Sequence, residues 1–191
     1  MARPKSLDKK NAILEAAMEV FAERGLESSP TSEISRRAGV AEGTLFTYFK
    51  TKDDLINALY RELKLEMADA MLSGFPRKKS VRQRVEHVWN GFITWSISHG
   101  KEKKVLDLLK TSERLTEETK AIGMAPFVEV EDTAREAIEH KIIEDLPLEF
   151  VGASMTGLAE ATICLMLKDP DRKDFYLKSG FDFYWKGLAR S

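Results

Sequence analysis

Side chains that can bind a phosphate or a base edge are concentrated between residues 43 and 52, in the stretch GTLFTYFKTK. Thr44, Thr47 and Tyr48 supply hydroxyl groups, which hydrogen-bond both phosphate oxygens and the edges of bases. Gly43 precedes them, and a glycine at the start of a helix lets backbone N–H groups come close to an anion. This combination of residue types indicates a surface that recognises nucleic acid.

The flanking segments are predicted to be helices that position this stretch. Apolar residues recur at helical spacing over residues 7–24, and Gly25 ends that pattern. A second helix is expected over about 30–38, with Ser29 as its N-cap, and a short third helix over about 42–49. Helix, short turn and short helix together form a helix-turn-helix arrangement.

The short third helix is predicted to have two sides with different roles. Leu45 and Phe49 are four residues apart and face inward. That placement directs Thr44, Thr47 and Tyr48 outward, where they can contact a ligand.

Lys52 lies in the first turn of the next helix, which Thr51 is expected to cap. A cation at this end opposes the helix dipole by about 0.3–1 kcal/mol unless it faces a negative group. We therefore expect Lys52 to contact a phosphate.

Charge is distributed unevenly along the chain. Residues 1–52 hold nine Lys and Arg against seven Asp and Glu, a net charge of +2, and the remainder holds 21 against 24, a net charge of −3, which together give −1. A solvated charged surface explains such an asymmetry equally well. The charge alone therefore does not indicate a polyanion-binding protein.

Enzyme chemistry is not indicated. His87, His99 and His140 form no zinc-binding pattern, and no glycine-rich loop has the spacing of a phosphate cradle, so neither a metal nor a cofactor is expected. Cys164 is the only cysteine; it is expected to be a small core residue and fits a reducing cytoplasm. No run approaches the roughly 18–20 apolar residues that span a bilayer, so no membrane association is expected.

The rest of the chain is also predicted to be helical. Helices are expected over about 80–99, 101–109 and 127–143, with a break near Gly123 and Pro126.

Two C-terminal helices carry more apolar surface than one inward face needs. Residues 148–168 are apolar nearly all round and must be covered on several sides. Within the helix expected over 171–190, six aromatic residues fall in the eleven positions 175–185. Aromatic residues are enriched in interface cores, so these helices favour a homodimer.

The N-terminal third of the sequence resembles a known family. The run ISRRAGVAEGTLFTYFKTKDDLINALY, residues 34–60, and the run ILEAAMEVFAERG, residues 13–25, resemble the DNA-binding domain of the TetR family of bacterial regulators. The resemblance is dense over residues 5–62. Further stretches, including MARPKS, AGVAEGTLF and the tryptophan at position 89, are most similar to the RamR-type branch of multidrug-responsive repressors.

The resemblance implies an all-α fold of about nine helices. A three-helix helix-turn-helix domain over residues 1–51 would be joined, through the fourth helix, to a helical ligand-binding and dimerisation domain over residues 52–191. Dimerisation would use about residues 147–190.

The resemblance also implies site residues, supplemented by neighbours at helical spacing. Expected DNA contacts are Arg3, Lys5, Arg37, Gly43, Thr44, Phe46, Thr47, Tyr48 and Lys52. Expected ligand contacts are Tyr60, Lys64, Met67, Trp89, Phe92, Phe127 and Met155. Expected dimer contacts are Met155, Leu158, Thr162, Phe175, Phe181 and Tyr184.

The chain departs from the family pattern at four positions. Phe46 stands where many relatives have tyrosine, and Ala41 where a capping serine is common. Met155 and Gly152 stand where the RamR-like branch has a large aromatic and an acidic residue. Both a flat cationic ligand and an apolar ligand in a methionine-lined pocket remain open.

The implied function is a cytoplasmic, homodimeric repressor of efflux-related or neighbouring genes. A small apolar or aromatic inducer would release it from a palindromic double-stranded operator. Two alternatives remain open: a helical ligand- or partner-binding protein with vestigial DNA binding, and an activating or ligand-independent regulator of the same family.

Overall fold

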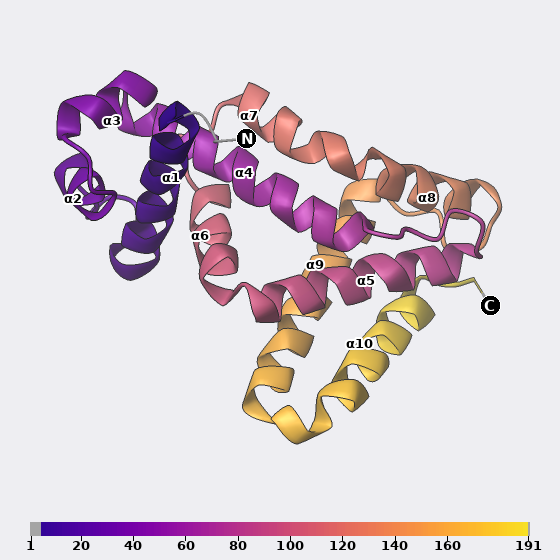
Figure 1. The fold of residues 1–191 in the computed structure, drawn as a ribbon. Helices are drawn as coiled ribbons and strands as arrows, with labels where there is room; N and C mark the ends of the chain where they lie inside the picture. The colour runs from indigo at the N-terminus through magenta and orange to yellow at the C-terminus, as the bar shows by residue number, and fades with distance from the viewer. Residues whose placement is uncertain (1–4, 191) are drawn as a thin grey trace. The chain divides into compact units, whose positions relative to one another are not determined.

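The structure is a computed structural model that describes residues 5–190. Every regular element in that range is helical, with ten α-helices and two short 3-10 helices (Figure 1). An isolated antiparallel bridge joins Ile143 to Ala189. The predicted all-α fold class is confirmed.

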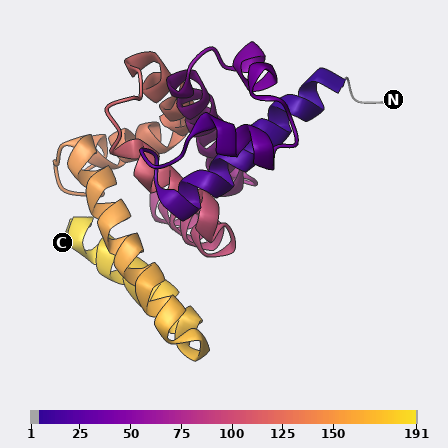
Figure 2. The ribbon, with the colours of Figure 1, turned by 90° about the vertical axis from the view of Figure 1, so that its left-hand side faces the viewer.

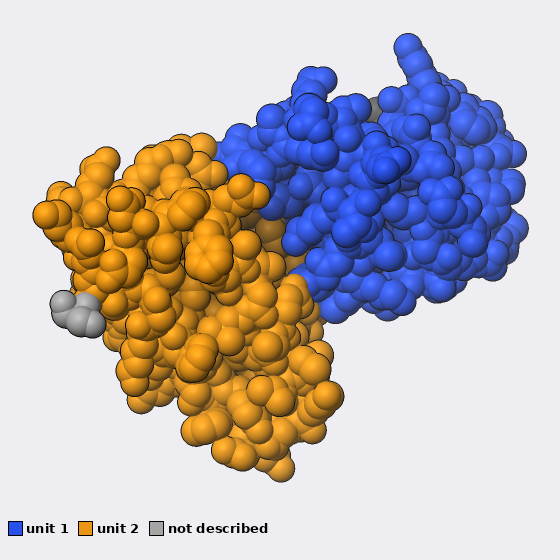
Figure 3. Space-filling model, turned by 180° about the vertical axis from the view of Figure 1, so that it is seen from behind, with its two compact units in different colours: residues 1–65, 99–125 blue, residues 66–98, 126–191 orange. Residues whose placement is uncertain are grey.

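The chain divides into two compact units, coloured separately in Figure 3. Residues 1–65 and 99–125 form the first, and residues 66–98 and 126–191 form the second. Helix α4 (Lys52–Leu72) begins in the first unit and ends in the second. The functional boundary between residues 51 and 52 remains a prediction.

The first unit is built around its N-terminal helix. It contains α1 (Lys5–Arg24), α2 (Thr31–Arg37), α3 (Glu42–Tyr48), α6 (Gly100–Lys110) and α7 (Glu117–Met124), with the start of α4. Helix α1 packs against α2, α3 and α6. Ile13, Phe21, Ile34 and Leu45 are completely buried, so the predicted inward face of the short helix is confirmed for Leu45.

Two glycines shape the connections of this unit. Gly25 and Gly39 have φ values of +76° and +67°, a left-handed conformation that favours glycine, and they end α1 and form the turn after α2. The predicted cap of α4 is confirmed, because Thr51 Oγ1 accepts a hydrogen bond from the Asp54 amide at 3.0 Å. The Asp54 carboxylate in turn accepts one from the Thr51 amide at 3.0 Å.

The predicted N-cap of α2 is wrong. Pro30 occupies that position, and no side-chain cap is formed. Ser29 is buried instead, and its hydroxyl donates to the Gly25 and Val20 carbonyls at 2.5 and 3.3 Å. It therefore supplies a donor to the Gly25 carbonyl, which lies just beyond the end of α1 where the helix provides no partner.

Helix α7 was not assigned from the sequence. It follows Thr116, whose Oγ1 accepts a hydrogen bond from the Thr119 amide at 3.1 Å. The break expected near Gly123 and Pro126 lies at its end, where the 3-10 helix η1 (Ala125–Phe127) begins. The next helix, α8 (Val128–Glu139), is shorter than the predicted segment, which extended to residue 143.

The second unit is a helical core closed by the C-terminal pair. Helix α5 (Val81–Ser98) packs against α8, α9 (Leu148–Lys168) and α10 (Lys173–Leu188), and η2 (Pro170–Arg172) joins the last two. Helices α9 and α10 lie side by side in both ribbon views (Figures 1 and 2). They approach closely at Gly180, where an added Cβ would lie 2.4 Å from Thr162 Oγ1.

Helix α9 differs from two expectations. Of the helices described, it alone is long and apolar enough, by length and composition, to cross a membrane, although we expected no such run. Only 28% of its apolar window is buried within the chain, so one copy of the chain leaves most of that window uncovered. Cys164, expected in the core, is exposed on this helix.

Candidate nucleic-acid interface

Helix α3 presents a mixed polar and apolar outer surface. Phe46 is 41% exposed, Gly43 and Thr47 are exposed, and Thr44 and Tyr48 are half-buried. The Thr47 hydroxyl donates to the Gly43 carbonyl at 2.9 Å, which leaves its oxygen free to accept from a ligand. The expected recognition residues therefore lie together on one short helix.

The start of α3 is held without a cap of its own. Ala41 occupies the N-cap position and makes no side-chain hydrogen bond, as its residue type predicts. Thr31 at the start of α2 donates instead to the Glu42 carboxylate at 2.8 Å. This bond links the first turns of the two helices of the helix-turn-helix.

Lys52 is directed toward the protein. Its ammonium group donates to the Leu26 carbonyl and lies 6.0 Å from the centre of the Phe21 ring. Partial burial lowers the pKa of Lys52. The Leu26 carbonyl thus provides the negative partner that Lys52 was expected to find in a phosphate. The contact between Lys52 and a phosphate remains a prediction.

Arg37 braces two helices. Its guanidinium donates to both carboxylate oxygens of Glu23 on α1, at 2.7 and 2.8 Å, and lies 3.4 Å from Glu33 on its own helix. The hydrogen bonds to Glu23 raise the pKa of Arg37 and lower that of Glu23. The Arg37 N–H groups, which were expected to contact a phosphate, thus donate to carboxylates within the protein.

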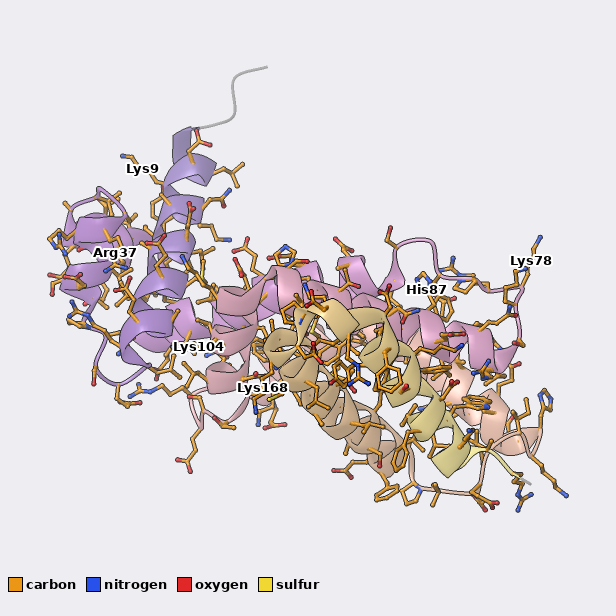
Figure 4. The ribbon with its side chains drawn as sticks, turned by 90° about the horizontal axis from the view of Figure 1, so that it is seen from below. Lys9, Arg37, Lys78, His87, Lys104 and Lys168 are labelled. Atoms are coloured by element: carbon orange, nitrogen blue, oxygen red, sulfur yellow. The ribbon has the colours of Figure 1, made fainter. Side chains whose placement is uncertain are left out.

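Other cations of this unit are more accessible. Lys9 and Lys10 on α1, Arg36 on α2 and Lys50 after α3 are exposed, and Figure 4 shows Lys9 projecting from its helix. These four residues are not among the DNA contacts expected from the sequence, because exposure cannot be seen in a single sequence. Of the expected contacts, Arg3 lies outside the described residues, as does the side chain of Lys5.

The segment before α7 is tied to the start of α4. Arg114 donates to the carboxylates of Glu27 and Asp53, at 2.9 and 2.7 Å. The buried Asn57 donates to the Arg114 carbonyl at 2.8 Å and accepts from the Thr116 amide at 3.0 Å. These bonds connect the helix that follows α3 to a segment distant in sequence.

Two expected ligand residues, Tyr60 and Lys64, lie on the same face of α4. Both are about 5% exposed, and both approach Gly123 of α7. Burial raises the pKa of Tyr60 and lowers that of Lys64 to about 8. They are brought together against α7, within the first unit.

The other expected ligand residues belong to the second unit. Met67, Phe92 and Phe127 are buried, and Trp89 is completely buried, donating to the Leu177 carbonyl at 3.2 Å and stacking on Tyr184. These contacts account for Trp89 as a core residue. Met155 lines a cavity of about 100 Å³, which includes none of the other expected ligand residues.

The expected dimer residues divide into two groups. Thr162, Phe181 and Tyr184 are at most 5% exposed and pack within the chain itself. Phe175 is 53% exposed, and Met155 and Leu158 are half-buried. Large exposed apolar residues that were not selected are Phe150, Leu165 and Leu167 on α9 and Phe183 on α10.

A short exposed helix after a glycine turn, braced by a longer helix, defines the class of helix-turn-helix proteins. Residues 13–59 match the family model of the bacterial regulatory proteins of the tetR family. The fatty acid metabolism regulator protein of Bacillus subtilis is 35% identical over 83 residues, which are 44% of this chain and 41% of that protein. The chain thus matches less than half the length of this curated relative.

Solved structures are similar over nearly the whole chain. A TetR-family transcription regulator from Shewanella sp. PV-4 has a TM-score of 0.86 and 25% identity, covering 96% of this chain and 99% of that one. The regulator FadR of Bacillus subtilis, in complex with stearoyl-CoA, has a TM-score of 0.73 and 22% identity, covering 93% and 98%. Residues 13–59 are thus similar to the TetR family of bacterial regulatory proteins, and the similar proteins named here are described as transcription regulators.

Proposed function

We propose that this protein is a homodimeric regulator that binds a palindromic DNA operator through α3 and releases it when a small apolar or aromatic molecule binds. The observation that carries the proposal is the placement of Gly43, Thr44, Phe46, Thr47 and Tyr48 on one short accessible helix. A helix of this kind enters the major groove with its first residues against base edges.

Dimerisation supports this proposal through geometry. Two recognition helices of a symmetric dimer read two half-sites roughly 34–36 Å apart. Helices α9 and α10 carry five large apolar side chains that are 46–74% exposed, and a second copy of the chain would cover them. A second copy that covered these side chains would also explain why α9 is so apolar without requiring a membrane. We therefore propose that the protein is cytoplasmic.

Ligand control is supported by the ties between α4 and the segment before α7. A ligand that displaced this segment would move α4, which directly follows α3, and so change the spacing of the recognition helices. FadR of Bacillus subtilis was solved with stearoyl-CoA, an amphipathic ligand. Control of efflux-related or neighbouring genes rests on the sequence resemblance to the RamR-type branch.

The test is fluorescence anisotropy on duplexes from upstream of the protein's own gene and its neighbours, with a scrambled duplex as control. We expect salt-sensitive binding to one palindromic fragment, which Tyr48→Ala weakens at least about tenfold without loss of helical circular dichroism. Tyr48→Phe removes only the hydroxyl and separates its hydrogen bond from ring contacts. Equal weak binding of the native protein to all duplexes, including those selected from random DNA, would favour vestigial DNA binding.

A reporter gene under the recovered operator distinguishes repression from activation. We expect expression to rise when the regulator is deleted. A fall in expression would identify an activator instead.

A further inference from the structure

Helix α3 presents one face to solvent more fully than its flanks. Gly43, Phe46 and Thr47 are all exposed, and they stand at positions i, i+3 and i+4, so they lie on one side of the helix. Thr44 and Tyr48 are only half-buried neighbours of this face. The three exposed residues, which we call the α3 outer face, thus combine an aromatic ring with a glycine and a hydroxyl group.

Phe46 lies at the centre of the surface proposed to contact DNA. It is 41% exposed, and its ring contacts no other aromatic ring and no cation among the residues that the structure describes. A single exposed apolar residue needs no explanation by itself. On a helix that enters a groove of DNA, however, the same ring would be buried against the base edges, and its contact would contribute to affinity.

Gly43 is not required by the fold. Its φ is not among the positive values of the chain, and a Cβ added to it would meet nothing within 4 Å. Alanine would therefore fit at this position, and inside a helix it is more favourable than glycine. A glycine that the fold does not need leaves space for the close approach of a ligand, one turn before Phe46 on the same face.

A free cation follows α3. Lys50 is exposed and makes no ion pair among residues 5–190. Arg37 and Lys52, by contrast, are bonded to groups of the protein itself. Phosphates line both edges of the groove and would attract Lys50, whereas the α3 outer face would meet the bases.

The major groove offers one kind of apolar group. The 5-methyl group of thymine projects into it, whereas the other groups that bases present there are hydrogen-bond donors or acceptors. A phenyl ring can neither donate nor accept a conventional hydrogen bond. The thymine methyl group is therefore the part of a base edge that Phe46 complements.

We propose that the Phe46 ring packs on the 5-methyl group of one thymine in each half-site, with the edge of that base lying over Gly43. This inference rests on the proposed function, because it requires α3 to enter the major groove. It makes Phe46 a specificity-determining residue, and it requires thymine at one fixed position of each half-site.

Deoxyuridine substitution in the operator tests the proposal on the full chain. Deoxyuridine pairs as thymine does and lacks only the methyl group. Each thymine of the duplex recovered by anisotropy is replaced, one position at a time, in both half-sites together. At one position we expect affinity to fall by about 15-fold, which is about fourfold for each methyl group that is no longer buried.

Matched variants assign this methyl dependence to Phe46. Phe46→Ala should bind the thymine and deoxyuridine duplexes of that position with equal affinity. Lys50→Gln is the control, because loss of a phosphate contact should weaken both duplexes equally, reduce the salt dependence and keep the 15-fold difference expected from methyl burial at about the same size.

Gly43→Ala tests the space beside the ring. Thermal melts should show the variant to be at least as stable as the native protein, since its Cβ meets nothing in the chain. Its operator affinity should nevertheless fall at least about tenfold, because the added methyl group occupies the space of the base edge.

Each contrary result has a separate meaning. Operator binding without methyl dependence at any position would refute the thymine contact and leave the proposed function standing. A dependence that persists in Phe46→Ala would assign the methyl group to another side chain, and full operator affinity of Gly43→Ala would refute the position of the base over Gly43. Failure of the native protein to bind any duplex, including those selected from random DNA, would refute the proposed function and the thymine contact with it.

Discussion

At the scale of single residues, cations of the helix-turn-helix segment contribute to the fold itself, whether or not they also contact DNA as proposed. Arg37 and Lys52 have the residue type and position of phosphate contacts. Both nevertheless find partners inside the protein, in the Glu23 carboxylate and the Leu26 carbonyl. A charged group takes the nearest acceptor that the fold provides, and a single sequence does not show which acceptor that is.

Lys64 leads to a prediction about pH. Burial lowers its pKa to about 8 from an ordinary value of 10.5, so the unfolded chain holds the proton to a higher pH than the folded chain does. The free energy of unfolding should therefore rise as pH increases from about 8 toward 10. Between pH 7.5 and 9.5 the native protein should gain about 2 kcal/mol relative to Lys64→Met.

Urea unfolding at several pH values measures this difference. The comparison stops at pH 9.5 because tyrosines titrate above it and Tyr60, whose pKa is raised, acts in the opposite direction. Parallel pH profiles for the native protein and Lys64→Met would show that Lys64 is not held in a desolvating site.

At the scale of elements, a helix that was not assigned from the sequence organises the first unit. Helix α7 begins at the Thr116 cap and approaches α4 at Gly123. Its position decides the environment of Tyr60 and Lys64, two residues selected as ligand contacts. Because α7 has only eight residues, its apolar periodicity is too short to stand out in the sequence.

Gly123 gives a prediction at this scale. A Cβ added there would lie 2.8 Å from Tyr60 Cε1 and 3.2 Å from Lys64 Cγ, so α7 or the two side chains must shift. We expect Gly123→Ala to lower the free energy of unfolding by about 1–3 kcal/mol. Gly187→Ala on α10 is the matched control, since nothing lies within 4 Å of its added Cβ and helical alanine is favoured by up to about 1 kcal/mol. Equal stability of both variants in denaturant melts would contradict close packing of α7 on α4.

At the scale of the whole molecule, the exposed apolar residues of α9 and α10 are the main feature that one chain does not explain. Leu165 and Phe183 are 46% and 74% exposed. Large exposed apolar patches mark interaction surfaces, and the proposed homodimer would bury this one.

Charged substitutions test this surface. The double variant Leu165→Glu/Phe183→Glu should be monomeric in sedimentation velocity at concentrations where the native protein is dimeric, because burying two carboxylates is costly. Its operator affinity should fall by at least about 100-fold, since each monomer reaches one half-site. Glu149→Gln, a polar change on α9, serves as the control. A monomer that keeps full operator affinity would refute the dimeric mode of binding.

The sequence by itself determined the class of fold and the position of the short helix α3 that is proposed to contact DNA. Helical periodicity, the glycine turns and the Thr51 cap are local signals in the sequence. They predict where the helices of the helix-turn-helix begin and end, and helical spacing predicts that Leu45 faces inward and the hydroxyl groups face outward. The all-α class follows for the same reason, because each helix satisfies its own backbone hydrogen bonds.

Only the tertiary structure decided which side chains meet. It engaged Arg37 and Lys52 within the first unit, buried Trp89, Phe181 and Tyr184 in the core of the second, and left Phe150, Leu167 and Cys164 outside. Helical spacing defines the faces of a helix, but the neighbouring elements decide which face is covered, and those neighbours lie far away in the chain.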